Sequence, residues 1–312
     1  MKIIHEISNF SSAEETHITI GTFDGVHFGH QEIIKKLVSS AKKARRKSVL
    51  LTFFPHPKKV IEKDSKIELI NTIDERALLL ERTGLDYLII QPFNASFSEL
   101  SALEFVKTLL VDKLHVAKLV IGYDHRFGKN REGDIEKLKT YSHLYQFEVE
   151  EISAQDINDV SVSSTKIRHA LHSGNLKTAN NYLGYHFMLN GTVVNGKHLG
   201  GTIGFPTANI DVKETYKLIP KTGVYVVKSL IDNATVFGMM NIGNRPTVSG
   251  THQTIEVHFF DFNAGLYGKN LTIELIYFLR DEHKFDSLEA LIHQLKKDRE
   301  TALDYLAKTP KF

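Results

Sequence analysis

The sequence predicts a Rossmann-like α/β domain followed by a small antiparallel β-barrel and a C-terminal helix. In the first half of the chain, strand-like apolar runs alternate with helical patterns, which is typical of a mainly parallel sheet with helices on both faces. From residue 185 to 280, short strand-like runs follow one another without helices, which is typical of a small barrel. One amphipathic helical pattern then closes the chain.

The first half contains runs of apolar residues that predict strands at residues 17–20, 48–54, 87–90, 118–122 and 147–152. Apolar residues three or four apart predict the intervening helices at residues 33–41, 74–82, 98–114 and 134–145. Because the carboxyl ends of parallel strands share one edge of a sheet, the loops that follow these strands are expected to form one site.

The second half begins after a short helical pattern that ends at Gly184. Short apolar runs separated by Gly and Asn turns predict strands at residues 224–230, 236–241, 255–260 and 271–279. The apolar stripe of residues 286–306 predicts a helix that packs on the barrel rather than one that binds a partner. We therefore expect two domains, residues 1–183 and 184–312.

Composition excludes several classes of protein. Lys and Arg number 39 against 37 Asp and Glu, so a net charge of +2 gives no bulk attraction to nucleic acid or a membrane. The chain has no cysteine, which excludes disulfides and thiolate metal sites. It has neither an apolar run of about 20 residues nor the apolar core of a secretory signal, so we expect a cytoplasmic protein.

Residues 21–30 lie between a predicted strand and a predicted helix, and they carry His27 and His30 with Gly29 between them. The start of a helix offers free backbone N–H groups and a positive dipole end to an anion. Gly29 would let a phosphate approach the backbone, and the histidines would supply donors. The alternative interpretation is a glycine-containing turn without a ligand.

Three further loops carry polar and aromatic groups. Residues 52–57 combine two prolines, two aromatic rings and His56, which the backbone alone could satisfy. Residues 121–133 place aromatic, acidic and basic groups between glycines, which suits a flat ligand with phosphates. Residues 162–168 open a helix with hydroxyls that either only cap it or also bind a phosphate, with Lys166 and Arg168 as countercharges.

Two stretches of the predicted barrel suit phosphate chemistry. Glycines at 196, 200, 201 and 204 free the backbone to wrap phosphates, while Thr207 and Asn209 are hard oxygen ligands two residues apart on an extended chain. Glu256 shares a strand face with His258, and a carboxylate pointing into the barrel mouth could accept a proton from a hydroxyl. The alternatives are a simple Pro-Thr-Ala-Asn turn and a surface glutamate on an edge strand.

Segments 21–30, 52–57, 122–128 and 163–168 together resemble the adenylyltransferase module of the prokaryotic bifunctional riboflavin kinase/FAD synthetase family. The segment Gly-Phe-Pro-Thr-Ala-Asn at 204–209 resembles the riboflavin kinase module of the same family. The resemblance covers almost the whole chain in the family's domain order. One departure is His125, where many members carry an aromatic residue.

The resemblance implies that the C-terminal domain phosphorylates riboflavin to FMN with MgATP. The N-terminal nucleotidyltransferase domain would then adenylylate FMN to FAD and release pyrophosphate. ATP, riboflavin and FMN are the implied partners, Mg²⁺ is the implied cofactor, and no nucleic acid or membrane is expected. The oligomeric state is left open.

The resemblance also implies roles for individual residues. Catalytic roles fall to His27, His30, Arg168 and Glu256, and Mg²⁺ is expected at Thr207 and Asn209. Contacts to ATP or its phosphates are expected from Gly21, Phe23, Asp24, Gly29, Asp124, Ser163, Ser164, Thr165, Gly196, Lys197, Gly200 and Gly204. Contacts to the flavin are expected from Phe54, Pro55, Pro57, Phe127, Asn241 and Arg245.

Two other functions compete with this one. The first is a nucleotidyltransferase for another phosphorylated substrate, such as phosphopantetheine, with the barrel as a binding module. The aromatic-proline loop and the barrel's own magnesium pattern argue against it. The second is a nucleotide-binding regulatory module whose barrel binds RNA, but the sequence has no stripe of alternating basic and aromatic residues.

Overall fold

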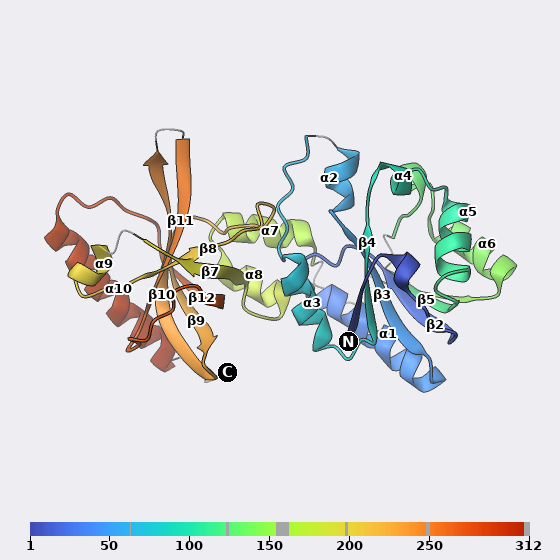
Figure 1. Cartoon of the computed structure of the whole chain (residues 1–312), viewed down its shortest axis with the longest axis horizontal. Coiled ribbons are helices and arrows are strands. Elements are labelled where there is room, and N and C mark those ends of the chain that lie inside the picture. The colour runs from blue at the N-terminus through green and yellow to red at the C-terminus, as the bar shows by residue number, and fades with distance from the viewer. Residues whose placement is uncertain (63, 123–124, 154–161, 197–198, 248–249, 309–312) are drawn as a thin grey trace. The chain divides into compact units, whose positions relative to one another are not determined.

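The computed structural model of the chain describes all residues except 63, 123–124, 154–161, 197–198, 248–249 and 309–312 (Figure 1). The described residues divide into two compact units, Met1–Ser164 and Thr165–Phe312, which we call the N-terminal and the C-terminal unit.

The N-terminal unit is built on a parallel sheet with the strand order β1-β4-β3-β2-β5-β6. The strands are β1 (Lys2–His5), β2 (Thr16–Ile20), β3 (Lys47–Phe54), β4 (Tyr87–Pro92), β5 (Val116–Gly122) and β6 (Glu148–Ile152). The chain moves from β2 to β3 on one side and returns to β5 on the other side of β2. The carboxyl ends of β2 and β5 are therefore a topological switch point, where open α/β sheets bind ligands.

Helices join these strands as the sequence predicts for an α/β fold (Figure 1). They are α1 (Phe28–Ala44), α2 (Pro57–Ile61), α3 (Ile73–Glu81), α4 (Ala95–Ser98), α5 (Ala102–Glu104) and α6 (Ile135–Tyr145), with short 3-10 helices at Ile7–Asn9 and Lys129–Arg131. The helix predicted over 98–114 instead starts after Ser101, whose hydroxyl accepts the Glu104 N–H, and continues as a π-helix over Phe105–Val111.

Strand β2 is buried along its whole length, although three of its five residues are polar. The polar side chains find partners inside the unit: the Thr16 hydroxyl donates to the Leu114 carbonyl at 2.5 Å, and His17 Nδ1 lies 2.8 Å from the Ser40 hydroxyl. Buried polar groups need such partners. The central strand is thus fixed in register directly before the turn that carries His27.

The C-terminal unit is a closed antiparallel barrel with the order β10-β11-β8-β7-β12-β9, which confirms the predicted architecture. Its strands are β7 (Met188–Val194), β8 (Ala208–Asp211), β9 (Gly223–Ile231), β10 (Ala234–Thr247), β11 (Gly250–Phe259) and β12 (Asn270–Arg280). The helices of this part of the chain are α7 (Ser164–His172), which begins at the last residue of the N-terminal unit, α8 (Leu176–Leu183), α9 (Leu199–Thr202) and α10 (Leu288–Lys308).

Helix α10 packs on the outside of the barrel, as its apolar stripe predicts. Val224, Val226 and Met239 of the barrel wall cluster with Ala302 and Leu295 of this helix. In a barrel, alternate residues of each strand face inward and outward. Helix α10 therefore covers the outer face of β9 and β10.

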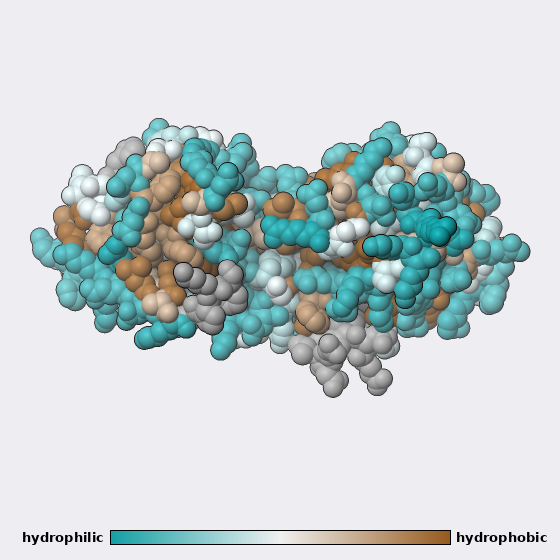
Figure 2. Space-filling view, turned by 90° about the horizontal axis from the view of Figure 1, so that it is seen from below, coloured by the Kyte–Doolittle hydropathy of each residue, from teal (hydrophilic) through white to brown (hydrophobic). Residues whose placement is uncertain are grey.

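The surface of both units is mainly polar on the side that Figure 2 displays, with smaller apolar patches among the hydrophilic side chains. Within the described ranges, no helix combines the length and the apolar character needed to cross a membrane.

Candidate active sites

The turn between β2 and α1 has an unusual backbone conformation. Phe23, Gly25 and Val26 have φ values of 49°, 91° and 35°. A positive φ is unfavourable for a β-branched residue such as valine, and such strain collects at functional sites. A side chain at Gly21 would lie 3.1 Å from the Phe23 ring. Contacts with surrounding residues, and not the intrinsic backbone preferences of Phe23 and Val26, therefore stabilise this turn.

His27 and His30 stand together at the start of α1, beyond the carboxyl end of β2. His27 is the N-cap of α1, and its Nδ1 accepts the His30 backbone N–H at 3.4 Å. The two rings stack with centroids 3.6 Å apart and an angle of 16° between planes. Because Nδ1 of His27 acts as an acceptor, the proton of a neutral His27 must be on Nε2. His27 can thus offer an N–H donor to an anion.

The pKa of His30 lies well below the usual value for histidine. Burial is the main cause, and the nearby charges of His27 and Arg76 act in the same direction. Its Nδ1 is buried and has no hydrogen-bond partner among the described residues. His30 is therefore neutral at pH 7, and the stacked pair avoids two adjacent positive rings.

Asp24, which was expected to contact the nucleotide, has a buried side chain with partners inside the unit. Its side chain is only 1% exposed, and its carboxylate accepts the backbone N–H groups of Ile70 and Asn71, both at 3.2 Å. It also forms an ion pair with Arg76, with Oδ1 and Nη2 3.7 Å apart. This geometry favours a positioning role for Asp24 over the predicted direct contact with nucleotide.

Ser164, the last residue of the N-terminal unit, contacts the same turn. The Ser164 hydroxyl donates to the Asp24 carbonyl at 2.8 Å. Ser163 is half-buried beside it, Thr165 is exposed, and Arg168 follows one turn later on the same helix. Gly29 is buried in the first turn of α1.

The predicted flavin contacts of the N-terminal unit divide into two groups. Phe54 is half-buried, Pro55 is exposed, and Pro57 begins α2. His56 caps that helix, since its Nδ1 accepts the Lys58 N–H, so the backbone does satisfy this loop histidine. Phe127 is 6% exposed and packs against Phe105 in the core, with ring centroids 5.6 Å apart, so its flavin contact stays a prediction.

The structure does not describe the side chains of three predicted site residues. Asp124 and Lys197 lie outside the described residues. Of Arg245, only the backbone is described, in β10 opposite His252. His125 stacks on Phe127 with ring centroids 6.0 Å apart, so the imidazole takes part in a ring contact at the position where the family pattern has an aromatic residue.

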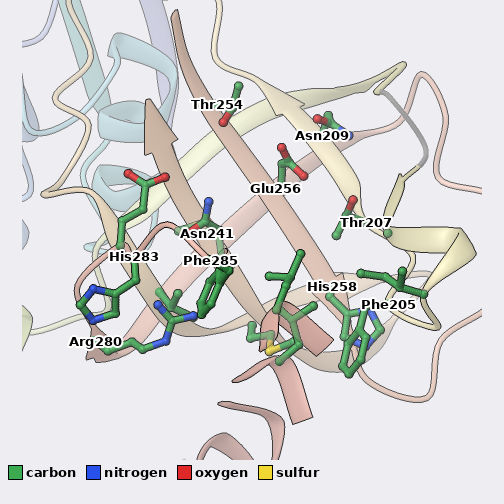
Figure 3. A pocket seen from close by; sticks show the side chains of 18 residues that line it. Phe205, Thr207, Asn209, Asn241, Thr254, Glu256, His258, Arg280, His283 and Phe285 are labelled. Carbon is green, nitrogen blue, oxygen red and sulfur yellow. The ribbon is translucent and has the colours of Figure 1, made fainter. Parts of the chain in front are cut away.

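The C-terminal unit brings most of its predicted site residues to one cavity of about 290 Å³, which we call cavity A (Figure 3). It lies between the barrel wall and α10. Its lining includes Gly200, Phe205, Thr207, Asn209, Asn241, Thr254, Glu256, His258, Arg280, Glu282, His283, Phe285, Leu291 and Leu295.

Glu256 is the centre of a polar row across three strands. In the register of the barrel, it pairs with Asn209 of β8 on one side and with Asn241 of β10 on the other. Figure 3 shows its carboxylate between these two amides. Ile255 and Val257, the neighbours in sequence, are buried on the opposite face of the strand. Glu256 therefore points to the outer face that α10 covers, not into the barrel mouth as the sequence suggested.

The glycine-rich segment packs directly on the two predicted metal ligands. A Cβ at Gly196 would lie 2.1 Å from Nδ2 of Asn209. A Cβ at Gly200 would lie 2.2 Å from the Phe205 carbonyl and 3.4 Å from Oγ1 of Thr207. On β11, His258 Nδ1 donates to the Pro206 carbonyl at 2.8 Å and so holds the residue before Thr207.

The sequence analysis did not predict the residues that bind α10 to the barrel beside cavity A. Nε and Nη2 of Arg280 donate to the Asp298 carboxylate at 2.7–3.1 Å, and Gln294 donates to the same group at 2.8 Å. Asp298 is only 5% exposed. The sequence did contain a signal for this contact. Asp298 follows Leu291 and Leu295 on the apolar stripe of the helix, where a buried charged residue needs a partner.

A second cavity of about 310 Å³, cavity B, lies against β7, β8 and β11. Val193, Ala208, Val257, Phe259 and Tyr267 contribute to its largely apolar lining. Thr207 borders both cavities. Two ligands could therefore meet at this threonine.

Comparison with known proteins assigns a family to most of each unit. The FAD synthetase family matches residues 9–166, and the riboflavin kinase family matches residues 183–306. Fold and sites together thus define a protein that joins an α/β nucleotidyltransferase unit to a kinase barrel.

Full-length relatives specify the protein further. The chain is 39% identical to the bifunctional riboflavin kinase/FMN adenylyltransferase of Listeria monocytogenes and 36% identical to that of Escherichia coli K12, over 99% of each chain. It belongs to the bifunctional riboflavin kinase/FMN adenylyltransferase family. A crystal structure described as a macrolide-efflux protein from Streptococcus pneumoniae has the same fold, with a TM-score of 0.88, 32% identity, and coverage of 96% of this chain and 98% of that one.

Proposed function

We propose that this chain phosphorylates riboflavin to FMN with MgATP and then transfers AMP from a second ATP to FMN, forming FAD and pyrophosphate. The observation that carries the proposal is the presence of both family matches on one chain, in the same order as in full-length relatives. We assign adenylyl transfer to residues 1–183 and phosphorylation to residues 184–312. Residues 167–182, which include most of α7 and α8, lie between the two family matches.

In the phosphorylation step, Glu256 would act as general base. Its carboxylate lies between Asn209 and Asn241, which could orient it toward a hydroxyl in cavity A. The rim of the cavity is polar at Thr254 and Thr207, while Leu291, Leu295 and Phe285 offer an apolar wall for a flavin ring. Proton acceptance by a carboxylate in hydrogen-bond reach is ordinary general base catalysis.

Thr207 and Asn209 would hold Mg²⁺ together with the phosphates of ATP. The donor set supports this, because Mg²⁺ prefers oxygen ligands and uses few from the protein. The described residues hold no cluster of three or more His, Cys, Asp or Glu side chains suited to a metal held by protein alone. Bound Mg²⁺ would neutralise phosphate charge during the transfer. A Cβ at Gly204 would meet nothing within 4 Å, whereas Gly196 and Gly200 let the segment pack closely against Asn209 and Phe205. Backbone contacts from these three glycines to the phosphates are part of the proposal.

Cavity B is the proposed site for the nucleoside of ATP. Its apolar lining suits an adenine ring, and Thr207 joins it to cavity A. The phosphates would then cross at Thr207 toward the hydroxyl that Glu256 activates. Such a transfer depends mainly on positioning and charge neutralisation.

In the adenylylation step, the FMN phosphate is already an anionic nucleophile, so no strong base is needed. The site must instead stabilise charge on the α-phosphate and the leaving pyrophosphate. His27 and His30 lie at the switch point for this task, with Gly21, Phe23 and Gly29 shaping the turn. The hydroxyls of Ser163, Ser164 and Thr165 and the charge of Arg168 are proposed phosphate contacts.

The test is a time course with purified full-length chain, riboflavin and MgATP, followed by mass detection of products. FMN should rise first and FAD should follow, with pyrophosphate released in step with FAD. A parallel incubation with phosphopantetheine and ATP should give no adenylylated product. FMN without FAD, or an adenylylated product only from phosphopantetheine, would overturn the proposal. The cytoplasmic location and the lack of nucleic acid partners remain predictions.

A further inference from the structure

Arg76 of α3 is a buried cation of the N-terminal unit that the proposed chemistry does not use. It is 1% exposed. Its Nη2 lies 3.7 Å from the Asp24 carboxylate, and its Nη1 donates to the Thr52 hydroxyl at 3.4 Å. Both partners belong to segments that the sequence singled out, the β2–α1 turn and the end of β3.

The partners of Arg76 extend its contacts into the candidate site. The Thr52 hydroxyl donates to the Thr22 carbonyl at 3.2 Å, at the start of the turn. The Asp24 carboxylate accepts two backbone N–H groups, and the Asp24 carbonyl accepts the Ser164 hydroxyl. One guanidinium thus links α3, β3, the turn before His27 and the first residue of α7.

A purely structural explanation of Arg76 is weak. Transferring two charges from water to the interior is expensive, and a buried ion pair can often be replaced by apolar side chains without loss of stability. A methionine would fill a similar space on α3 beside the buried Ala77 and Leu80. The turn itself needs support, since Phe23 and Val26 have positive φ values.

We propose that Arg76 is a positioning residue for adenylyl transfer: by holding Asp24 and Thr52, it fixes the turn that presents His27 and His30 to the nucleotide. The inference rests on the proposed function of this unit. Arg76 acts through the turn and touches no substrate.

Arg76 also affects the charge state of the site. The groups near His30 are the stacked His27 ring, the Phe23 ring 4.8 Å away, and the Arg76–Asp24 pair behind the turn. The charge of Arg76 adds to burial and to His27 in keeping the pKa of His30 low. Removing this charge would take away one of the causes that lower the pKa of His30, so that pKa would rise.

The experiment compares Arg76→Met, Arg76→Lys and Thr52→Val in the full chain, with Arg82→Met as control. Arg82 is exposed at the end of the same helix. For each variant, kcat and KM of FAD formation from FMN and ATP are measured from pH 5 to 9. Riboflavin phosphorylation by the C-terminal unit is measured in the same samples as an internal reference.

For Arg76→Met we expect kcat of FAD formation to fall about a hundredfold, as for a small misplacement of catalytic groups, with KM little changed. The acid limb of its pH profile should move to higher pH. Arg76→Lys should keep the position of the limb and recover part of the rate. Thr52→Val should lower kcat without moving the limb, and Arg82→Met should match the wild type.

The outcomes separate the two proposals. If the wild-type chain forms no FAD, the proposed function fails. If it forms FAD while Arg76→Met has the wild-type rate and pH profile, the positioning role is overturned. If Arg76→Met does not fold, Thr52→Val and Arg76→Lys test the inference. Wild-type kcat in both of these variants would contradict it. A lower kcat of FAD formation in Thr52→Val, with riboflavin phosphorylation intact, would support it.

Discussion

Asn209 of β8 and Glu256 of β11 occupy paired positions on adjacent antiparallel strands. The pairing places a proposed metal ligand and the proposed base side by side on the face that α10 covers. Strand pairing sets this distance, so neither side chain depends on a flexible loop for its place. Sites built on strands are held more accurately than sites built on loops.

Glu256→Gln should lower the rate of riboflavin phosphorylation by about 10²–10⁴-fold, the usual contribution of a general base. Adenylylation of supplied FMN should stay unchanged, because it is assigned to the other unit. The measurement is chromatography of FMN formed from riboflavin and of FAD formed from FMN. Glu274→Gln is the control, since Glu274 pairs with His186 and Lys228 and does not line cavity A. A fully active Glu256→Gln enzyme would refute the base assignment.

His30→Ala should show the opposite separation. Losing a transition-state donor should raise the barrier of FAD formation by roughly 2.7–4 kcal/mol, while FMN formation continues. His143→Ala, which removes an exposed histidine of α6, serves as the matched control. An unchanged adenylylation rate in His30→Ala would mean that the stacked histidines serve only the structure of the turn.

Gly196→Ala and Gly201→Ala should differ sharply. The new methyl group at residue 196 would overlap the Asn209 amide, whereas a Cβ at residue 201 meets nothing within 4 Å. Displacing Asn209 by about 1 Å should lower phosphorylation up to about a hundredfold and raise the Mg²⁺ concentration needed for half-maximal rate. A Mg²⁺ titration of both variants checks this. Equal curves would argue against a metal contact by Asn209.

Asp298→Ala should destabilise the C-terminal unit by roughly 3 kcal/mol, because it leaves Arg280 without its carboxylate partner in a largely buried place. Arg299→Ala breaks the neighbouring exposed pair with Asp261 and should change stability by less than about 1 kcal/mol. Urea unfolding of the full chain, followed by hydrogen exchange in α10, measures both. Similar effects of the two changes would contradict a buried anchor.

Acid should weaken the N-terminal unit selectively. His17 and His30 both have pKa values below the usual 6.5, mainly because of burial. Below about pH 6.5 the unfolded chain binds protons that the folded unit does not, so stability is full above this pH and falls as pH decreases. Protection factors of β2 and α1 amides, which are exchange rates corrected for the intrinsic rate at each pH, should be lower at pH 5.5 than at pH 7.5, and His30→Gln should reduce this difference. Equal protection factors at the two pH values would contradict a histidine that is buried in its neutral form.

Much of the fold could be predicted because burial leaves a clear pattern. The apolar runs at 48–54 and 118–122 became β3 and β5, and their position predicted which loops meet. β1 and β7 were not among the predicted strands, and β8 was expected only as an extended chain at Thr207 and Asn209. β7 and β8 flank a glycine-rich segment, and glycine weakens the strand signal. The π-helix over Phe105–Val111 was missed because its apolar spacing resembles that of an α-helix.

Some candidate site residues could also be selected from the pattern of the sequence. Thr207, Asn209 and Glu256 could be selected from residue type and spacing, because alternation along a strand fixes which side chains share a face. Alternation does not say which face a helix covers, so Glu256 was placed on the wrong side of the barrel wall. The contacts of Phe127 with Phe105 and of Asp24 with Arg76 could not be predicted, because each pair of partners is distant in sequence.

The two-sided character of β11 has a consequence for how this enzyme can fail. Ile255 and Val257 belong to the barrel core, and Glu256 belongs to cavity A. A slip of one residue in the pairing of β11 would reverse every side chain of the strand. The proposed base would then be driven into hydrocarbon while valine faced the substrate. Folding errors in this strand would therefore yield chains without kinase activity, and selection for activity would also be selection for correct strand alignment.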